Sequence, residues 1–303
     1  MLDLAIVIVN YNVRDLLYQC LQSVYASEGN VAYEVCVVDN ASADNSCSMV
    51  SDDYPQASLI ELDDNIGYPA ANNVGLNHFG DWSSETPPAR YALLLNPDTE
   101  LKPDTLYQMI RYMDGQPDVG VAGPKLVLPN GQIDPACRRS FPTPEIIFYR
   151  VAQLSRIFPN SRRFARYNLT FLDEDQEAEV DSVVGAFMMV RAMAIARVGL
   201  LDERFFMYAE DLDWAKRIKE DGWRVMYNPY VVVKHVKRAS SRQMPKRMRL
   251  EFERANLRFY RKHYQSNTPF LVNAAILAAI ALRGGRALWS EIWNSSMKQA
   301  ETV

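Results

Sequence analysis

The chain has 303 residues, 48% of them hydrophobic, and a formal net charge of −4. This composition is typical of a folded globular protein with one large core or two smaller ones, so it excludes disorder as the default state. The charge is uneven, because residues 237–262 carry about +8, a block that favours an anionic ligand or surface but also fits a solvated helix face.

In the first half of the chain, short β-branched runs alternate with segments of helical periodicity. This alternation predicts parallel strands joined by crossover helices, hence a doubly wound, mostly parallel α/β sheet with helices on both faces. Ligands of such sheets bind beyond the carboxyl ends of the strands. The expected strands are Leu4–Val9, Tyr33–Val38, Ser58–Leu62 and Tyr91–Leu95, and the expected helices are Val13–Ser27, Asp44–Asp53, Pro69–Phe79 and Pro103–Met113.

The second half is less regular. A hairpin is expected at Pro129-Asn130-Gly131, and residues 140–179 are interpreted as a substrate-facing insertion. Strands are then expected at Val180–Val190, Trp223–Tyr227 and Val231–His235, a helix at Asp211–Asp221, a basic amphipathic helix at Pro245–His263 and an apolar segment at Phe270–Leu282. We therefore expect one domain over residues 1–240, with a regular half (1–123) and a less regular half (124–240), and a C-terminal basic, amphipathic helical extension over 241–303.

The two ends of the chain bear on its location. The amino end reaches its first apolar run without a basic stretch, and the run stops at Asn10, so we expect no signal peptide and a cytoplasmic protein. Phe270–Leu282 is shorter than the roughly 20 residues that cross a bilayer. The basic helix and the apolar segment favour peripheral contact with the inner face of the cytoplasmic membrane, but packing on the core or a homodimer contact explains them equally well.

Polar residues follow the first two expected strands. Asn10-Tyr11-Asn12 closes the first strand, and Asp39 with Ser42 follows the second, so adjacent strands would bring the two motifs side by side. A carboxylate in this position is able to hydrogen-bond a base or a ribose, although Asp39 and Ser42 would also serve as a helix cap.

A small-residue segment follows the third expected strand, from Asn65 through Gly67 to Asn72 and Asn73. A flexible glycine before a helix permits close approach of a ligand, and the helix N-terminus favours phosphate. A tight turn would look similar. The segment matches neither GxGxxG nor a Walker-type GxxxxGK, which argues against dinucleotide dehydrogenases and phosphate-loop hydrolases.

Acidic residues and a histidine occur at three further positions. Asn96-Pro97-Asp98 ends the fourth strand and offers a carboxylate for a hard divalent cation, although Asn-Pro-Asp is also ordinary turn chemistry. His235 ends an apolar strand, and an imidazole there completes a metal shell only if Asp98 lies within reach. Glu210, Asp211 and Asp213 open a helix, where like-charged neighbours raise one another's pKa and produce a usable general base.

Taken together, these motifs resemble the glycosyltransferase family 2 enzymes of the GT-A fold, and among them the bacterial rhamnosyltransferase-like group. The match covers most of residues 1–240. The segments that carry it are Ile8-Val9-Asn10-Tyr11-Asn12, Val38-Asp39-Asn40-Ala41-Ser42, Asn65-Ile66-Gly67-Tyr68 with Asn72-Asn73, Asn96-Pro97-Asp98, and Gly185-Ala186-Phe187 leading to Glu210-Asp211-Leu212-Asp213-Trp214.

The resemblance implies a metal-dependent inverting glycosyltransferase, with a nucleotide-sugar-binding half (1–123) and an acceptor-binding half (124–240). Its cofactor would be Mg²⁺ or Mn²⁺, and its substrates a nucleotide-diphosphate sugar, with rhamnose as one option, and a saccharide or lipid-linked saccharide acceptor in cell-surface polysaccharide or glycolipid assembly. No nucleic acid partner is implied. The family's metal motif is usually Asp-x-Asp, whereas this chain has Asn96 in the first place. The residues implied are Asp211 with its neighbour Glu210 for catalysis, Asp98 and His235 for the metal, and Asn10, Tyr11, Asp39, Asn65, Gly67, Asn72 and Asn96 for the donor.

Two other functions fit the predicted sheet. A noncatalytic scaffold or binding protein of a polysaccharide assembly complex would keep the fold, but the intact acidic cluster argues against it. A sugar-phosphate nucleotidyltransferase would need a Gly-rich, Arg-containing loop after the first strand, and the sequence has none there.

Overall fold

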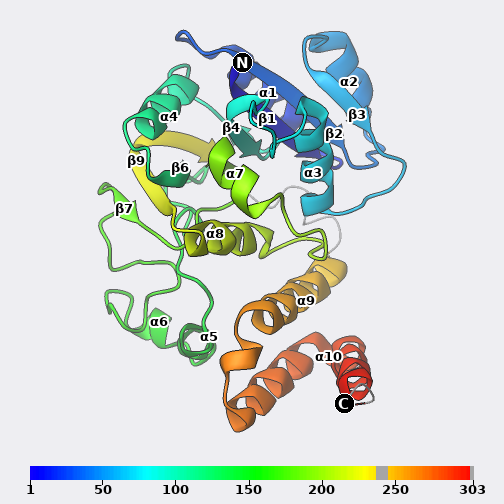
Figure 1. Ribbon diagram of the computed structural model, residues 1–303, viewed down its shortest axis with the longest axis vertical. Coiled ribbons are helices and arrows are strands. Elements are labelled where there is room, and N and C mark those ends of the chain that lie inside the picture. Colours follow the sequence, from blue (N-terminus) through cyan, green and yellow to red (C-terminus); the bar gives the residue numbers. More distant parts are fainter. Residues whose placement is uncertain (237–244, 301–303) are drawn as a thin grey trace.

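The computed structural model describes residues 1–236 and 245–300, apart from the side chains of residues 245, 286 and 293–300. Within this part, a mixed sheet runs in the order β3-β2-β1-β4-β8-β6-β9-β5, with β7 paired to β9 (Figure 1). The expected domain boundary at 240/241 and three cations of the basic block, Lys237, Arg238 and Arg242, lie outside the described residues. The strands are β1 (Leu2–Asn10), β2 (Tyr33–Asp39), β3 (Ser58–Glu61), β4 (Ala89–Leu95), β5 (Thr99–Glu100), β6 (Val119–Val127), β7 (Ala178–Glu179), β8 (Phe187–Arg191) and β9 (Arg224–His235).

The directions of the strands decide where the site forms. Strands β3, β2, β1 and β4 are mutually parallel, and β8 is antiparallel to both β4 and β6. Since β6 and β9 are parallel to each other, β9 runs in the same direction as β4. The carboxyl ends of β1, β2, β4 and β9 therefore meet at one edge of the sheet, together with the beginning of β8.

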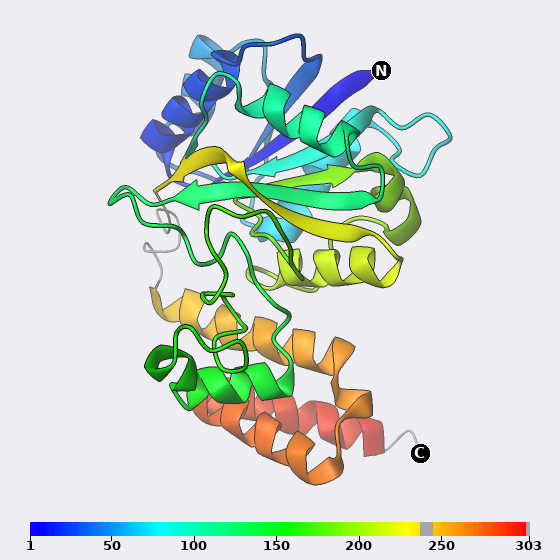
Figure 2. The same ribbon diagram turned by 90° about the vertical axis from the view of Figure 1, so that its left-hand side faces the viewer.

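Helices cover both faces of the sheet (Figure 2). One face carries α1 (Arg14–Tyr25), α2 (Ser46–Asp53) and α4 (Thr105–Asp114), and the other carries α3 (Tyr68–Phe79), α7 (Ala192–Val198) and α8 (Glu210–Glu220). The core consists of the two-sided apolar strands and the buried stripe of each helix, for example Leu17, Leu21 and Val24 of α1. This is the doubly wound, mostly parallel arrangement that the sequence predicts, and the hydrophobic effect of burying both sheet faces stabilises it.

Two strands differ from the prediction. The run expected at Val180–Val190 forms a strand only from Phe187, because Ser182 leaves the sheet to pair with Arg139. The two strands expected near the end of the domain are one strand, β9, whose register against β6 shifts between Pro124 and Lys125. The predicted hairpin is present, with Gly131 at φ +80° and a hydrogen bond from the Leu128 amide to the Gln132 carbonyl (2.8 Å).

The expected insertion helices and the C-terminal helices lie together on the side of the sheet that α8 covers, further from the sheet than α8 (Figure 2). The insertion contains α5 (Pro144–Val151) and α6 (Leu154–Ile157). Helix α9 (Pro245–His263) packs on the domain, as one of the alternatives for the C-terminal helices predicts, and the bilayer and homodimer contacts stay predictions. The packing is through a small apolar cluster: Phe205, Ala209, Leu212, Ala255 and Phe259. A 3-10 turn, η2 (Gln265–Asn267), leads to α10 (Phe270–Ala300), which is kinked at Gly285 and packs on α9.

Candidate active site

A cavity of about 730 Å³ opens at the carboxyl edge of the sheet. Asp98 and Asp211, which are far apart in the sequence, both line it. Most of the site residues predicted from the sequence also line it: Tyr11, Asn65, Gly67, Asn96, Glu210 and His235. The fold therefore brings residues from the β1, β3, β4, β9 and α8 regions to one concave surface.

A short strand pairing places Asp98 beside His235. Strand β5, which directly follows Asp98, pairs antiparallel with the end of β9, so that Thr99 lies opposite His235. Asp98 Oδ1 is 3.3 Å from His235 Nε2, and both side chains are buried. His235 Nδ1 is 3.0 Å from Asp134 Oδ2, an acidic residue that is fully buried. The imidazole thus lies between two carboxylates.

Burial and the two carboxylates act on His235 in opposite directions. Burial disfavours the charged imidazolium, but hydrogen bonding to Asp134 and Asp98 and their negative charge outweigh it and raise the pKa of His235 to about 9. Asp98 Oδ1 is buried, and apart from its 3.3 Å contact with His235 Nε2 it has no hydrogen-bond partner in the described part of the chain. An unpartnered carboxylate oxygen facing an imidazole nitrogen is a donor set that suits a divalent cation.

Asp211 is held in a fixed orientation by three donors. Its Oδ2 accepts from Arg139 Nη2 at 2.6 Å and from the Gly185 amide at 3.0 Å, and its Oδ1 accepts from the Leu212 amide at 2.7 Å. The Arg139–Asp211 ion pair is buried, with side-chain exposures of 10% and 7%. Buried charges are stable only when they are paired and hydrogen-bonded, so Arg139 and the two amides hold the Asp211 side chain in one position at the cavity wall.

Glu210, the neighbour of Asp211, has a different environment. Its side chain is buried, and its Oε2 has no hydrogen-bond partner in the described chain. Burial first, and then the charge of Asp211, raise the pKa of Glu210 to about 8. The expectation that clustered carboxylates shift a pKa upward is met at Glu210.

The backbone before these two carboxylates is strained. Tyr208 and Ala209 are both in the left-handed region, with φ of +72° and +62°. Non-glycine residues avoid this region because the side chain crowds the backbone, at a cost of about 1–2 kcal/mol each. Packing of Ala209 in the cluster under α9 holds this turn in place and directs Glu210 and Asp211 toward the cavity.

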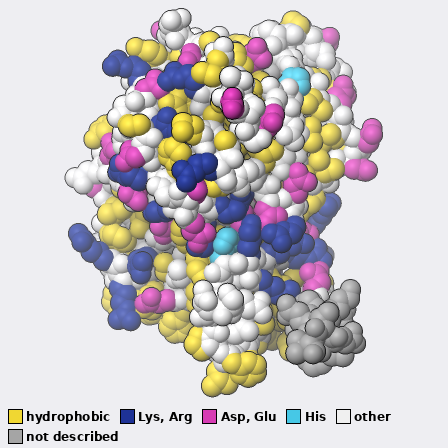
Figure 3. Space-filling model, viewed as in Figure 1, with side chains coloured by type: hydrophobic (Ala, Val, Ile, Leu, Met, Phe, Trp, Pro, Cys, Tyr) yellow, Lys and Arg dark blue, Asp and Glu magenta, His cyan; other side chains and the backbone are white. Residues whose placement is uncertain are grey.

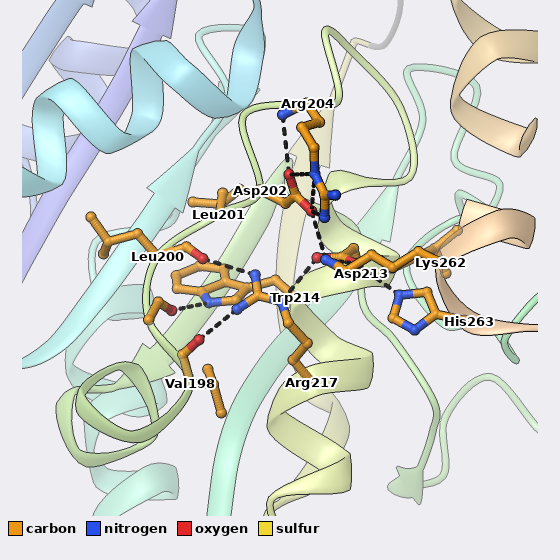
Figure 4. Close-up of polar contacts among 12 residues, drawn as sticks. Val198, Leu200, Leu201, Asp202, Arg204, Asp213, Trp214, Arg217, Lys262 and His263 are labelled. Carbon is orange, nitrogen blue, oxygen red and sulfur yellow. Dashed lines mark hydrogen bonds and ion pairs between the residues drawn. The ribbon is translucent and has the colours of Figure 1, made fainter. Parts of the chain in front are cut away.

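The third acidic residue of the cluster, Asp213, has a structural role. It is fully buried and does not line the cavity. Figure 4 shows its carboxylate facing helix α9, where Oδ1 is 2.7 Å from both Lys262 Nζ and His263 Nε2, while Oδ2 accepts from Arg217 Nε at 2.9 Å. Burial opposes ionisation, but these hydrogen bonds and charges hold the pKa of Asp213 below its usual range. Asp213 thus fastens the end of α9 to the helix that carries Glu210 and Asp211.

The segment before α3 forms another wall of the cavity. Gly67 has φ +92°, and a side chain there would lie 2.5 Å from the Phe206 carbonyl, so only glycine fits. Asn40 holds this segment, because its Nδ2 donates to Asn65 Oδ1 (3.1 Å) and its Oδ1 accepts from the Ile66 amide (2.9 Å). The first helical amide, that of Tyr68, donates to the Phe206 carbonyl (2.8 Å).

The Tyr68 hydroxyl connects two walls of the cavity. It lies 2.9 Å from Asn96 Oδ1 and 3.0 Å from the Gly185 carbonyl, two acceptors for its one proton. Asn96 is thereby fixed at the position where the family's motif usually has a first aspartate.

Three predicted donor-binding residues lie outside the cavity lining. Asn10 and Asp39 are adjacent in the sheet as expected, with Asn10 Nδ2 donating to Asp39 Oδ2 at 2.8 Å, and both are buried. Asn72 is buried in α3 and donates to the Tyr68 carbonyl (2.8 Å). Their donor-binding roles stay predictions.

The sequence did not point to Asp134, Arg139 or Asn40 as site residues. Asp134 and Arg139 lie in the irregular stretch after β6, where no periodicity indicates which side chains face inward. Asn40 stands next to Asp39 in the second motif, and its position directly after a buried strand is a signal that could have identified it.

The fold has solved counterparts. The mannosyltransferase PcManGT from Pyrobaculum calidifontis, in complex with GDP-Man and Mn²⁺, matches with a TM-score of 0.57 at 18% identity, over 98% of this chain and 82% of that one. Residues 1–349 of S. aureus TarS match with a TM-score of 0.55 at 13% identity, over 94% and 82%. The sheet and its covering helices thus define the GT-A fold class.

Family models identify the chain further. The model of glycosyl transferase family 2 matches residues 5–174, more than half of the chain, and that of glycosyl transferase family group 2 matches residues 91–297. The chain belongs to glycosyltransferase family 2, and the resemblance inferred from the motifs is confirmed.

Two curated relatives are rhamnosyltransferases. The N-acetylglucosaminyl-diphospho-decaprenol L-rhamnosyltransferase of Mycobacterium tuberculosis is 29% identical, over 80% of this chain and 78% of the relative. Rhamnosyltransferase WbbL of Escherichia coli K12 is 24% identical, over 90% and 94%.

Proposed function

We propose that this glycosyltransferase moves a sugar, with rhamnose the first candidate, from a nucleotide diphosphate to a hydroxyl of a lipid-linked saccharide in cell-surface polysaccharide assembly. The observation that carries the proposal is that Asp98 and Asp211 line one cavity. The named activities of the two rhamnosyltransferase relatives support the choice of sugar and of a lipid-linked acceptor. The donor would occupy the part of the cavity formed by residues 1–123, and the acceptor the part formed by residues 124–240.

A divalent cation, Mg²⁺ or Mn²⁺, fits at Asp98 and His235. The described residues contain no group of three or more His, Cys, Asp or Glu side chains around one point, so diphosphate oxygens and water would complete the shell. When bound there, the cation would neutralise charge on the departing diphosphate. Asp134 would fix the orientation of His235, because a ligating histidine is normally held through its other ring nitrogen.

The chemical step is a single displacement. Asp211 would accept the proton of the acceptor hydroxyl while the hydroxyl oxygen attacks the anomeric carbon from the side opposite the diphosphate. The bond to the diphosphate breaks as the new bond forms, so the configuration at the anomeric carbon is inverted without a covalent intermediate. Arg139 supports this assignment because its 2.6 Å ion pair fixes the position of the Asp211 side chain at the cavity wall. Glu210 is the competing base, since its unpartnered oxygen and its pKa of about 8 suit proton transfer above neutral pH.

Turnover of two variants separates these roles. If Asp211 is the base, Asp211→Asn lowers kcat by roughly 10²–10⁴-fold at every pH, whereas Glu210→Gln lowers it less. If Glu210 is the base, wild-type kcat rises through about pH 8 and Glu210→Gln removes that rise. The anomeric configuration of the product, read by NMR, tests inversion.

The alternative is a noncatalytic scaffold. A thermal-shift screen with a panel of nucleotide diphosphates and Mn²⁺ identifies the favoured nucleotide, because a bound ligand stabilises the folded state. A hydrolysis assay of the matching nucleotide sugar with Mg²⁺ or Mn²⁺ then tests catalysis. Binding of nucleotides without any hydrolysis or transfer would favour the scaffold.

A further inference from the structure

The insertion between β6 and β7 carries an unusual combination of side chains. Residues 146–172 contain five arginines and no Asp or Glu, while the one carboxylate of α5, Glu145, lies 3.8 Å from Arg163 Nε. All five arginines are exposed, and so are four large apolar side chains. We call these residues the α5–α6 surface: Phe148, Val151, Ile157 and Phe158, with Arg150, Arg156, Arg162, Arg163 and Arg166.

The apolar side chains of this surface project from a packed base. Phe148 and Ile157 are 62% and 63% exposed. Beneath them, Phe164 contacts the rings of Tyr149 (5.0 Å between centroids) and Phe158 (5.6 Å). The exposed residues therefore do not signal a poorly packed insertion, because the Tyr149–Phe164–Phe158 ring contacts stabilise it.

A second exposed apolar group borders this surface. Phe270 and Leu271, at the start of α10, are each 80% exposed. A groove of about 430 Å³ lies between the two elements, with Pro144 and Arg166 on one side and Val272 on the other. Figure 3 shows Lys and Arg together with hydrophobic side chains at the lower left of the molecule, and a hydrophobic group at its lower end.

We infer that the α5–α6 surface contacts an anionic lipid bilayer. Exposed Phe and Ile side chains insert into the headgroup region, while arginines pair with lipid phosphates. The absence of carboxylates over residues 146–172 is the charge complementarity that such a bilayer requires. Across the part of the chain that the structure describes, no helix has the length and hydropathy to cross a membrane, which leaves the mode of contact peripheral.

The basic helix α9 is less suited to this contact. Lys262 is paired with Asp202 and Asp213, and Arg254 with Glu251 and Glu291. These cations are neutralised within the protein. Lys262 fastens α9 to the domain, Arg254 fastens α10 to α9, and Arg249 of α9 lines the catalytic cavity, so we assign the membrane contact to the α5–α6 surface.

The position of the surface relative to the cavity suits a lipid-linked acceptor. Arg150 of α5 also lines the catalytic cavity. A saccharide anchored in the bilayer would therefore reach Asp211 without leaving the membrane surface. This link to the acceptor rests on the proposed function, whereas bilayer binding itself does not.

The test is co-sedimentation of the full-length protein with phosphatidylcholine vesicles, with and without phosphatidylglycerol. We expect binding to the anionic vesicles at low salt and weaker binding at high salt. Arg156→Gln with Arg162→Gln should lower the partition coefficient roughly 30-fold, since one basic residue near an anionic surface contributes about fivefold. Phe148→Ser with Ile157→Ser should lower it by about tenfold or more.

Matched variants elsewhere serve as controls. Met193→Ser with Tyr230→Ser removes equally exposed apolar groups, and Lys246→Gln with Arg258→Gln removes two α9 cations; both should bind like wild type. Failure of the wild type to sediment with anionic vesicles at low salt overturns the inference. So does loss of binding only in the α9 variant, or self-association through this surface in size-exclusion chromatography without vesicles.

Catalysis is read separately. The α5–α6 variants should hydrolyse the donor like wild type, since none of the four substituted side chains lines the cavity. Vesicle binding without any sugar transfer would leave the surface assignment standing and refute the proposed function.

Discussion

Arg139 Nη2 lies 2.6 Å from Asp211 Oδ2 inside the protein, where solvent reaches little of either side chain. The pair joins the irregular insertion to the first turn of α8, and it holds in place the carboxylate that we propose as the base. Removing one partner of a buried ion pair lowers the free energy of unfolding strongly, because the other charge is then buried without compensation.

Arg139→Met is therefore expected to lower the free energy of unfolding by about 3–5 kcal/mol, as measured by urea denaturation. In that variant the Asp211 carboxylate has lost its charged partner, and adding Asp211→Asn removes this unpaired charge. The double variant should be more stable than the sum of the single losses implies. Strict additivity of the two losses would contradict the coupling.

The stability of the protein should depend on the ionisation of Glu210. Its pKa is raised from 4.5 in the unfolded chain to about 8 in the folded protein, so the folded state holds the proton more tightly. The stabilisation is complete below about pH 4.5 and is lost as the pH rises toward 8, with a slope of at most about 1.4 kcal/mol per pH unit.

Glu210→Gln should remove this dependence. The difference in free energy of unfolding between variant and wild type, measured from pH 5 to pH 8, should then shift in favour of the variant as the pH rises. A difference that stays constant over this range would show that Glu210 has no raised pKa.

Asp134 should govern cation affinity through His235. Asp134→Asn removes the charge that orients the imidazole, and loss of such a partner typically lowers metal affinity by about 10–100-fold. Titration of Mn²⁺ by electron paramagnetic resonance, without substrate, measures this directly. Asp15→Asn, on the exposed face of α1, is the matched control and should bind Mn²⁺ like wild type. Equal affinity in the Asp134 and Asp15 variants would refute the role.

Asp213 should be required for stability. Asp213→Asn leaves Lys262, Arg217 and His263 facing an uncharged amide, and we expect a loss of about 3 kcal/mol in the free energy of unfolding. Glu220→Gln breaks the exposed pair with Lys216 on the same helix and should cost less than about 1 kcal/mol. Similar losses in the two variants would argue against a special role of the Asp213 network.

Much of the fold is accessible from local sequence patterns. The helix at Pro245–His263 has the predicted limits, and strands β1, β2 and β4 lie close to theirs. These elements depend on apolar periodicity and turn residues, which are local properties of the chain. The regular segment expected at Val180–Val190 is a strand only from Phe187, because Asp181 and Ser182 pair with Arg139, a contact that no local pattern encodes.

The sequence by itself determined the family, the class of sheet and which kinds of side chain the site contains. Periodic segments predict the strands and helices, and motifs such as Asn96-Pro97-Asp98 and Glu210-Asp211 lie at the ends of these segments. Only the tertiary structure decided how these groups are paired. It placed Asp134 behind His235 and Arg139 on Asp211, separated Asp213 from its two neighbours, and left the arginines of the insertion exposed. The reason is physical: burial, ion pairing and the pKa values they set arise from contacts between segments distant in sequence, whereas periodicity reports only on neighbours along the chain.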